Sequence, residues 1–248
     1  MLAARQLSLQ YPGKRLCRSL NFEVNPGECW AILGQNGCGK TTLLHALGGL
    51  RAPDSGTVTI QGNAISALPR RERACKLGVM LQEEPGEFWG TVRDYILLGR
   101  YPHVKSLFGW DDPDYAMVEK VIAKLDLSQL ADRSLSTLSG GERQRARIAL
   151  LLAQSPEYYL LDEPLQHLDL RHQYLTMALL HDIAQQGQAV IMVLHDIHWL
   201  TPFCDHVLML FNDGHALAGK TTELVTQANL EALYQCRISY SSMNERTI

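Results

Sequence analysis

The sequence has no long apolar run and few cysteines. Its 248 residues include six cysteines without a Cys-x-x-Cys pair, which disfavours both a zinc site and a disulfide framework. No apolar stretch approaches the roughly 20 residues that a membrane-spanning helix needs, and the N-terminus lacks the apolar core of a signal peptide. We therefore expect a protein of the cytoplasm.

A large excess of charge is also missing. The formal net charge is −3 and no basic block is present, so nothing in the sequence favours nucleic-acid binding. Hydrophobic residues make up 46% and charged residues 20%, as is ordinary for a globular protein. The length suits one α/β domain with insertions, or at most two small domains.

The strongest motif lies at residues 34–42, which read Gly-Gln-Asn-Gly-Cys-Gly-Lys-Thr-Thr. The fixed positions of a phosphate-binding loop are occupied by Gly34, Gly39, Lys40 and Thr41. An apolar run of strand type precedes the loop at residues 29–33, and apolar residues at helical spacing follow at residues 43–47. A strand, a glycine turn and a helix start together form an anion site, because their N–H groups face one point.

This loop predicts a site for ATP and Mg²⁺, although an ordinary glycine-rich turn is the alternative for the pattern taken alone. Lys40 should reach the β and γ phosphates, and the Thr41 hydroxyl should bind Mg²⁺. Since Cys38 lies inside the loop, we expect its alkylation to block nucleotide binding. The predicted nucleotide contacts within the loop are Gly34, Asn36, Gly37, Cys38, Gly39, Lys40, Thr41 and Thr42.

Polar residues follow three further apolar strand runs, at residues 77–81, 158–161 and 189–194: they are Gln82, Asp162 with Glu163, and His195. The ends of parallel strands are where open α/β sheets bind ligands. We expect Asp162 to hold Mg²⁺ and Glu163 to act as general base on the attacking water. His195 could contact the γ phosphate or the water, although a lone histidine at a strand end is more often structural.

Other periodic segments predict the scaffold. Alternating runs at residues 7–11, 20–24 and 57–60, with turns between them, predict a small antiparallel β layer. An apolar stripe predicts a helix over residues 114–127, and a strand with an Asn-Asp-Gly turn predicts a hairpin from residue 207. Ser139 and Glu142 have capping-box spacing, which explains the stretch 138–142 as the start of a helix.

Taken together, the motifs resemble the ATP-binding subunit of an ATP-binding cassette (ABC) transporter over roughly residues 3–220. The elements that carry the resemblance are, in chain order, the phosphate loop, Gln82, the signature Leu-Ser-Gly-Gly-Glu at residues 138–142, Asp162-Glu163, Leu168-Asp169 and His195. The resemblance implies an α/β fold, a P-loop NTPase (RecA-like) core with an N-terminal antiparallel β layer and an inserted α-helical subdomain. It also implies one ABC ATPase domain over residues 1–223, with the helical subdomain at about 84–155, and a short tail at 224–248.

The resemblance further implies a head-to-tail dimer in which each ATP lies between two copies. Ser139, Gly140 and Gly141 would then contact the γ phosphate that Lys40 of a second copy binds. Tyr11 matches the aromatic residue that stacks on adenine, Gln82 the residue that senses Mg²⁺ or water, and Asp169 the aspartate that links the two active sites. The chain departs from the common pattern at Cys38, at Leu165 and at Gln166-His167, and none of these changes removes a catalytic group.

Two signals favour an importer. Residues 96–103, Ile-Leu-Leu-Gly-Arg-Tyr-Pro-His, resemble a segment of large-type (type II) bacterial importers for iron-siderophores, haem, cobalamin and molybdate, although local rules explain them equally well as a helix end. The sequence ends soon after Glu223, without room for a regulatory domain. We expect an importer ATPase, peripheral on the inner face of the membrane through a separate permease and working with a substrate-binding protein. The alternative is a soluble ABC-type ATPase that drives a non-transport protein or nucleic-acid complex.

Overall fold

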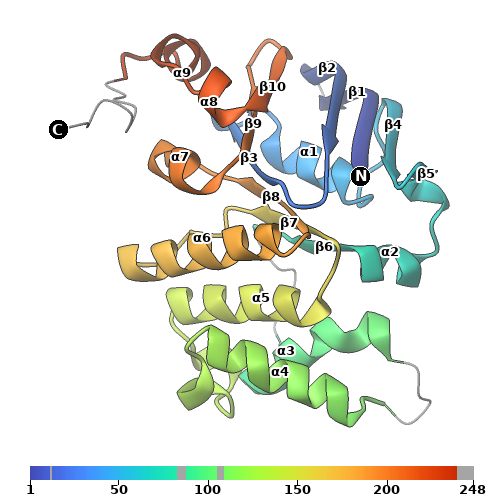
Figure 1. Ribbon diagram of the computed structural model, residues 1–248, viewed down its shortest axis with the longest axis vertical. Helices are drawn as coiled ribbons and strands as arrows, with labels where there is room; N and C mark the ends of the chain where they lie inside the picture. Colours follow the sequence, from blue (N-terminus) through green and yellow to red (C-terminus); the bar gives the residue numbers. More distant parts are fainter. Residues whose placement is uncertain (12, 83–87, 105–108, 239–248) are drawn as a thin grey trace.

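The computed structural model describes residues 1–11, 13–82, 88–104 and 109–238. Its centre is a six-stranded sheet in the order β10-β9-β3-β8-β7-β6 (Figure 1). The strands are β3 (Cys29–Gly34), β6 (Leu77–Met80), β7 (Tyr158–Asp162), β8 (Ala189–Val193), β9 (His206–Leu210) and β10 (Ala216–Lys220). All pairs are parallel except β9 with β10, which form the predicted hairpin.

Every residue of β3, β7 and β8 is buried. Continuous apolar runs of this kind are typical of parallel strands that are covered on both faces. Because these strands run in the same direction, the segments that follow them meet at one edge of the sheet. The phosphate loop follows β3, Gln82 lies shortly after β6, and Glu163 and His195 follow β7 and β8.

A second sheet forms the predicted antiparallel layer, in the order β2-β1-β4-β5. Its strands are β1 (Leu2–Tyr11), β2 (Lys14–Val24), β4 (Ser55–Ile60) and β5 (Asn63–Ala64). Helix α1 (Lys40–Leu47) packs between the two sheets, and its apolar side chains join one cluster with residues of both (Figure 1). The start of α1 is thereby fixed against the strand that supplies the phosphate loop.

Helices cover the opposite side of the central sheet (Figure 1). They comprise α3 (Val92–Leu97), η2 (Leu98–His103), α4 (Asp112–Lys124), η3 (Ser128–Leu130), η4 (Leu135–Thr137), α5 (Gly140–Gln154) and α6 (Leu170–Gln185). The apolar residues of these helices belong to the same hydrophobic cluster as one face of the central sheet. Helix α4 ends three residues earlier than predicted, since Leu125 leaves helical geometry and Asp126 adopts a left-handed conformation with φ of 57°.

The segment 96–103 is tied into this helical part by several contacts. Arg100 Nε donates to Asp114 Oδ1 at 2.8 Å in a largely buried ion pair, and Arg100 Nη1 donates to the Ala153 carbonyl at 2.7 Å. His103 Nε2 lies 2.7 Å from the Gln154 carbonyl. Burial acts to raise the pKa of Asp114, but the hydrogen bond and charge of Arg100 outweigh it and lower that pKa.

The remaining helices are α2 (Arg70–Lys76), η1 (Ile65–Ala67), η5 (Ile197–Trp199), α7 (Leu200–Phe203), α8 (Thr221–Leu224) and α9 (Gln227–Tyr234). Helix α9 is not a loose tail, because Leu230 and Leu233 are buried in the main hydrophobic cluster. Within the described ranges, no helix is both long enough and apolar enough to cross a membrane.

Candidate functional site

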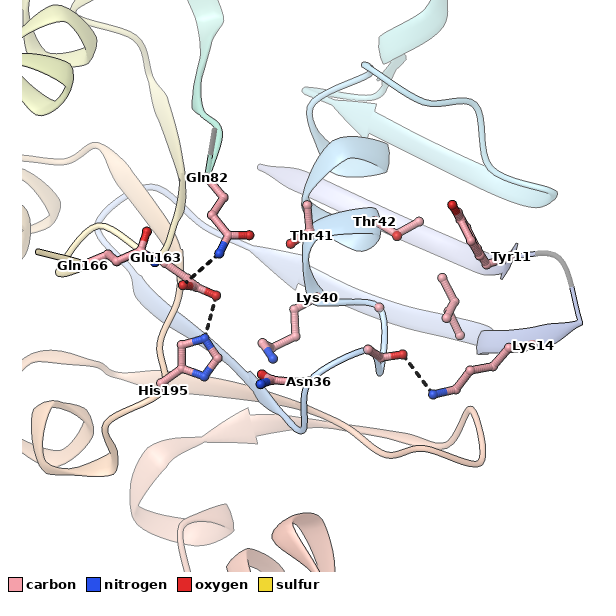
Figure 2. A pocket seen from close by; sticks show the side chains of 13 residues that line it. Tyr11, Lys14, Asn36, Lys40, Thr41, Thr42, Gln82, Glu163, Gln166 and His195 are labelled. Carbon is pink, nitrogen blue, oxygen red and sulfur yellow. Dashed lines mark hydrogen bonds and ion pairs between the residues drawn. The ribbon is translucent and has the colours of Figure 1, made fainter. Parts of the chain in front are cut away.

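A pocket of about 610 Å³ opens at the edge of the central sheet where the strand ends meet (Figure 2). It lies between the β1–β2 hairpin, the phosphate loop and the segments after β6, β7 and β8. The lining residues are Tyr11, Lys14, Leu16, Asn36, Gly37, Gly39, Lys40, Thr41, Thr42, Gln82, Glu163, Gln166 and His195. The structure therefore brings together most of the nucleotide-binding and catalytic residues that the sequence predicts.

The phosphate loop needs glycine where its backbone turns closely past other atoms. A Cβ on Gly34 would lie 2.6 Å from the Leu210 carbonyl oxygen, and one on Gly39 would lie 2.8 Å from Leu16 Cβ. Gly39 also has φ of +110°, a conformation that side chains resist, and it is the N-cap residue directly before α1. Lys40 is buried and donates through Nζ to the Gly34 carbonyl at 2.8 Å and to the Gln35 carbonyl at 3.1 Å. Lys40 therefore holds the first residues of the loop through hydrogen bonds to their backbone carbonyls.

Cys38 occupies a different place from the one that its position in the motif suggests. Its side chain is fully buried, packs behind the loop towards Gly34, and does not line the pocket. Burial also raises the pKa of the Cys38 thiol. The expectation that alkylation of Cys38 would block nucleotide binding stays a prediction, and the burial of the thiol means that a reagent would reach it slowly. Only the backbone of Cys38 can contribute to an anion site.

Glu163 is the centre of a hydrogen-bonded group (Figure 2). Its Oε1 lies 2.6 Å from His195 Nε2, and its Oε2 accepts a hydrogen bond from Gln82 Nε2 at 3.2 Å. Glu163 has φ of 51°, a left-handed conformation that is uncommon for a side-chain-bearing residue and typical of functional sites. Gln144 of α5 holds this turn, because its Nε2 donates to the carbonyls of Glu163 and Pro164. The carboxylate is thereby aimed into the pocket.

Asp162 has the properties of a metal-binding carboxylate. It is 1% exposed, and among the described residues neither of its side-chain oxygens has a partner at normal hydrogen-bond geometry. Burial raises the pKa of Asp162, and the Thr41 hydroxyl, which acts in the opposite direction, does not reverse this. A buried carboxylate without a partner is costly, so it fits a bound cation.

No group of three or more His, Cys, Asp or Glu side chains that could hold a metal exists in the part of the chain that the structure describes. A cation at Asp162 would therefore need hydroxyl, phosphate and water oxygens as its other ligands. Mg²⁺ prefers this set, and Thr41 supplies the hydroxyl. Asp162 and Thr41 would hold such an ion, which would supply positive charge to offset that of the nucleotide phosphates.

The signature residues lie outside the pocket. Ser139 begins α5 with a full capping box: the Glu142 N–H donates to Ser139 Oγ at 3.3 Å, and the Ser139 N–H donates to Glu142 Oε2 at 2.8 Å. These bonds to Ser139 lower the pKa of Glu142. Glycine at position 141 is needed for space, because a Cβ there would lie 2.9 Å from the His167 carbonyl oxygen. The start of α5 is therefore well formed, but it does not line the pocket beside the phosphate loop.

Asp169 likewise does not line the pocket. It caps α6, accepting the His172 N–H at 2.8 Å through Oδ1, and is exposed. The structure thus separates the predicted residues into two sets. One set belongs to the segments around the pocket, although Gly34, Cys38 and Asp162 of this set do not line it. The other set, which consists of Ser139, Gly140, Gly141 and Asp169, lies away from it.

Three lining residues were not found from the sequence: Lys14, Leu16 and Gln166. Lys14 pairs with Tyr11 across the β1–β2 hairpin, and its Nζ donates to the Gly37 carbonyl at 2.9 Å (Figure 2). The signal was available, since a basic residue shortly after an aromatic one at a hairpin turn places both side chains near each other. To use this signal, one must know at which residues the β1–β2 hairpin turns.

Comparisons with known proteins agree with this arrangement. A family model described as "ABC transporter" matches residues 17–166. The chain is 39% identical over 232 residues to the hemin import ATP-binding protein HmuV of Gloeobacter violaceus, covering 91% of this chain and 83% of that protein. It is 36% identical over 239 residues to the ferric enterobactin transport ATP-binding protein FepC of Escherichia coli K12, covering 95% and 88%.

Solved structures give the same result. A metal-chelate type ABC transporter in an inward-facing conformation aligns with a TM-score of 0.81 and 32% identity, covering 94% of this chain and 88% of that one. A dimeric ATP-binding cassette bound to ADP and Pi aligns with a TM-score of 0.80 at 24% identity, covering 89% and 98%. At 24% identity, the match to the second structure shows a shared fold and nothing more.

Proposed function

The chain belongs to the ABC transporter family of ATPases, and we propose on this basis that it is the ATP-hydrolysing subunit of an importer. It would energise uptake of a metal chelate, haem, cobalamin or a similar compound through a separate membrane permease. The relatives named above are import or transport ATP-binding proteins for hemin and ferric enterobactin, which supports this class of cargo. The observation that carries the catalytic part is Glu163, held by His195 and Gln82 at the mouth of the phosphate loop.

The chemistry follows from the pocket. Tyr11 offers an exposed ring on which an adenine can stack, while the loop backbone and Lys40 bind the phosphates. Glu163 takes a proton from the attacking water as general base. His195, hydrogen-bonded to Glu163 Oε1, orients that carboxylate and can donate to the γ phosphate in turn. Gln82 fixes the other oxygen of the carboxylate.

The second set of residues acts on a second copy of the chain. We infer a head-to-tail dimer in which the α5 start at Ser139, Gly140 and Gly141 faces the phosphates held by Lys40 of the other copy. Helix α5 is 15 residues long, so its first N–H groups and dipole suit an anion. Asp169 at the start of α6 would lie along the same interface. ATP binding then closes the dimer, and closure is transmitted to the permease.

Three exposed apolar side chains near the helical part mark the proposed permease contact: Trp89, Leu98 and Tyr101, which are 89%, 39% and 73% exposed. Large exposed aromatics of this kind dominate the energy of protein interfaces. Trp89→Ala should therefore weaken permease co-purification and transport while leaving ATPase activity of the isolated chain intact. Tyr115→Ala, at another exposed aromatic of the helical part, is the matched control. Unchanged co-purification with Trp89→Ala would remove this surface from the proposal.

The transport role has a direct test. A strain that lacks this gene should lose uptake of one compound among an iron-siderophore, haem, cobalamin and molybdate, and the wild-type gene should restore it while Glu163→Gln should not. Retained uptake of all four, with an ATPase that co-purifies with a DNA or protein complex and no permease, would instead support a non-transport ATPase.

A further inference from the structure

Gln35, the second residue of the phosphate loop, is hydrogen-bonded at both ends of its side chain. Its Nε2 donates to the Leu233 carbonyl in the last turn of α9 at 3.0 Å. Its Oε1 accepts from Asn212 Nδ2, in the β9–β10 turn, at 2.7 Å. Leu233 and Asn212 are far from the loop in sequence, so one half-buried amide joins the loop to two distant segments.

Helix α9 is well placed to act as a fixed support. The last carbonyls of a helix have no partner within it, and the Gln35 amide satisfies one of them. Leu230 and Leu233 anchor the helix in the core, and Gln235 ends it with φ of 55°. In Figure 1, α9 lies beside α8 near the end of the described chain. Its position is therefore supported by packing in the core in addition to its contact with the loop.

The same network continues to the other side of the loop. Asn212 Oδ1 accepts from Lys14 Nζ at 3.2 Å, and Lys14 Nζ also donates to the Gly37 carbonyl at 2.9 Å. The backbone of Gln35 takes part as well, because its carbonyl accepts from Lys40 Nζ. The loop is thus held at Gln35 and at Gly37, shortly before residues 39–42, which line the pocket.

We propose that α9 is a positioning element of the nucleotide site and that Gln35 is the positioning residue that couples them. The proposal rests on the proposed ATPase function and deepens it. By holding the Gln35 peptide, α9 keeps the loop in its phosphate-binding shape before the nucleotide arrives, which lowers the entropy lost on binding. Because coupling between two sites is reciprocal, bound nucleotide must in turn stabilise the docking of α9.

The test uses the full chain with Gln35→Met, which keeps the length of the side chain and removes both hydrogen bonds. We expect the KM for ATP to rise about three- to tenfold, the value of one or two hydrogen bonds, with kcat within about twofold of wild type. Hydrogen exchange with and without Mg²⁺–ADP should show that nucleotide protects residues 227–235 in the wild type and that Gln35→Met loses this protection. Asn212→Ala should give a smaller change in the same direction.

Gln227→Ala is the control, because Gln227 lies on α9 but hydrogen-bonds Glu231 of the same helix. It should keep the wild-type KM and the nucleotide-dependent protection. An unchanged KM for ATP in Gln35→Met, or nucleotide-dependent protection of α9 as large as in the wild type, would overturn the proposal. The proposed ATPase function would still stand in that case, provided that the wild-type chain hydrolyses ATP. A wild-type chain that neither binds nor hydrolyses ATP would instead contradict the proposed function itself.

Discussion

Two helix starts in this chain, those of α1 and α5, differ in what surrounds them. The start of α1 at Lys40 lies in a pocket with Glu163, His195 and Gln82. The start of α5 at Ser139 has a full capping box, which the start of α1 lacks, yet it lies outside that pocket. Glu163, His195 and Gln82 line the pocket at the first start, and none of the three lies at the second. In the proposed head-to-tail dimer, this difference means that one chain would hold complementary halves of two sites.

We call the pocket at the start of α1 the first region and the start of α5 the second region. The largest effect should come from removing the proposed general base, Glu163, in the first region. Glu163→Gln keeps the shape of the side chain but loses the proton acceptor, so turnover should fall by about 10²- to 10⁴-fold. ATP affinity should persist, because the loop and Lys40 are untouched. Single-turnover hydrolysis and equilibrium binding of ATP would measure the two effects, and near-normal turnover would remove Glu163 from its role.

Loss of the buried lysine should weaken the first region by a different route. Lys40→Ala removes a charged donor to the phosphates, and we expect the Kd for ATP to rise about 10- to 100-fold. Isothermal titration of the isolated chain measures this directly. If ATP binding were unchanged in Lys40→Ala, the first region would hold nucleotide without its lysine. The comparison of the two regions would then fail.

A change in the second region should leave nucleotide binding by one chain intact. Ser139→Ala should lower turnover by about tenfold, through loss of one hydrogen bond to the phosphate of the partner copy, with little change in the Kd of a single chain. It should also cost about 1 kcal/mol of stability, because the helix cap is lost. Ser136→Ala, at an exposed serine on the preceding η4 turn, controls for local disturbance. If Ser139→Ala changed the Kd of a single chain for ATP, Ser139 would take part in nucleotide binding within its own chain, which would contradict its assignment to the second region.

The smallest effect concerns stability at Asp162. Its pKa is raised above the ordinary value of 3.8, so the folded chain binds the proton more tightly than the unfolded chain does. The charged carboxylate therefore destabilises the ligand-free fold at pH values above the raised pKa, and the cost disappears as the pH falls through it towards 3.8. Asp162→Asn should stabilise the ligand-free chain by about 1 kcal/mol at pH 8 and by less at pH 4.5. Thermal melts at both pH values would show it, and a gain that grew on acidification would contradict the assignment.

The sequence predicts the first region well because its signals are local. A glycine loop between a strand and a helix, and polar residues directly after apolar runs, need only the general rule that parallel strands end at one edge. The same locality predicted the capping box of Ser139, which the structure confirms. The hairpin from residue 207 and the antiparallel layer are confirmed for the same reason.

What the sequence did not reveal depends on tertiary contacts. Lys14 lines the pocket only because the β1–β2 register places it opposite Tyr11. The sequence did not reveal the direction of the Cys38 side chain, because inside a tight loop it follows from packing against Gly34 and not from the motif. The contact of α9 with Gln35 joins residues almost two hundred positions apart in the chain, which no local pattern encodes.

Mixing two inactive variants tests most directly that the two regions are halves of shared sites. One variant carries Lys40→Ala with an intact signature, and the other carries Ser139→Arg with an intact phosphate loop. A mixed head-to-tail dimer has one fully intact site, so random pairing should restore about a quarter of wild-type hydrolysis. Activity in the mixture above the sum of the separate samples is the predicted result. Activity no greater than that sum would contradict the account.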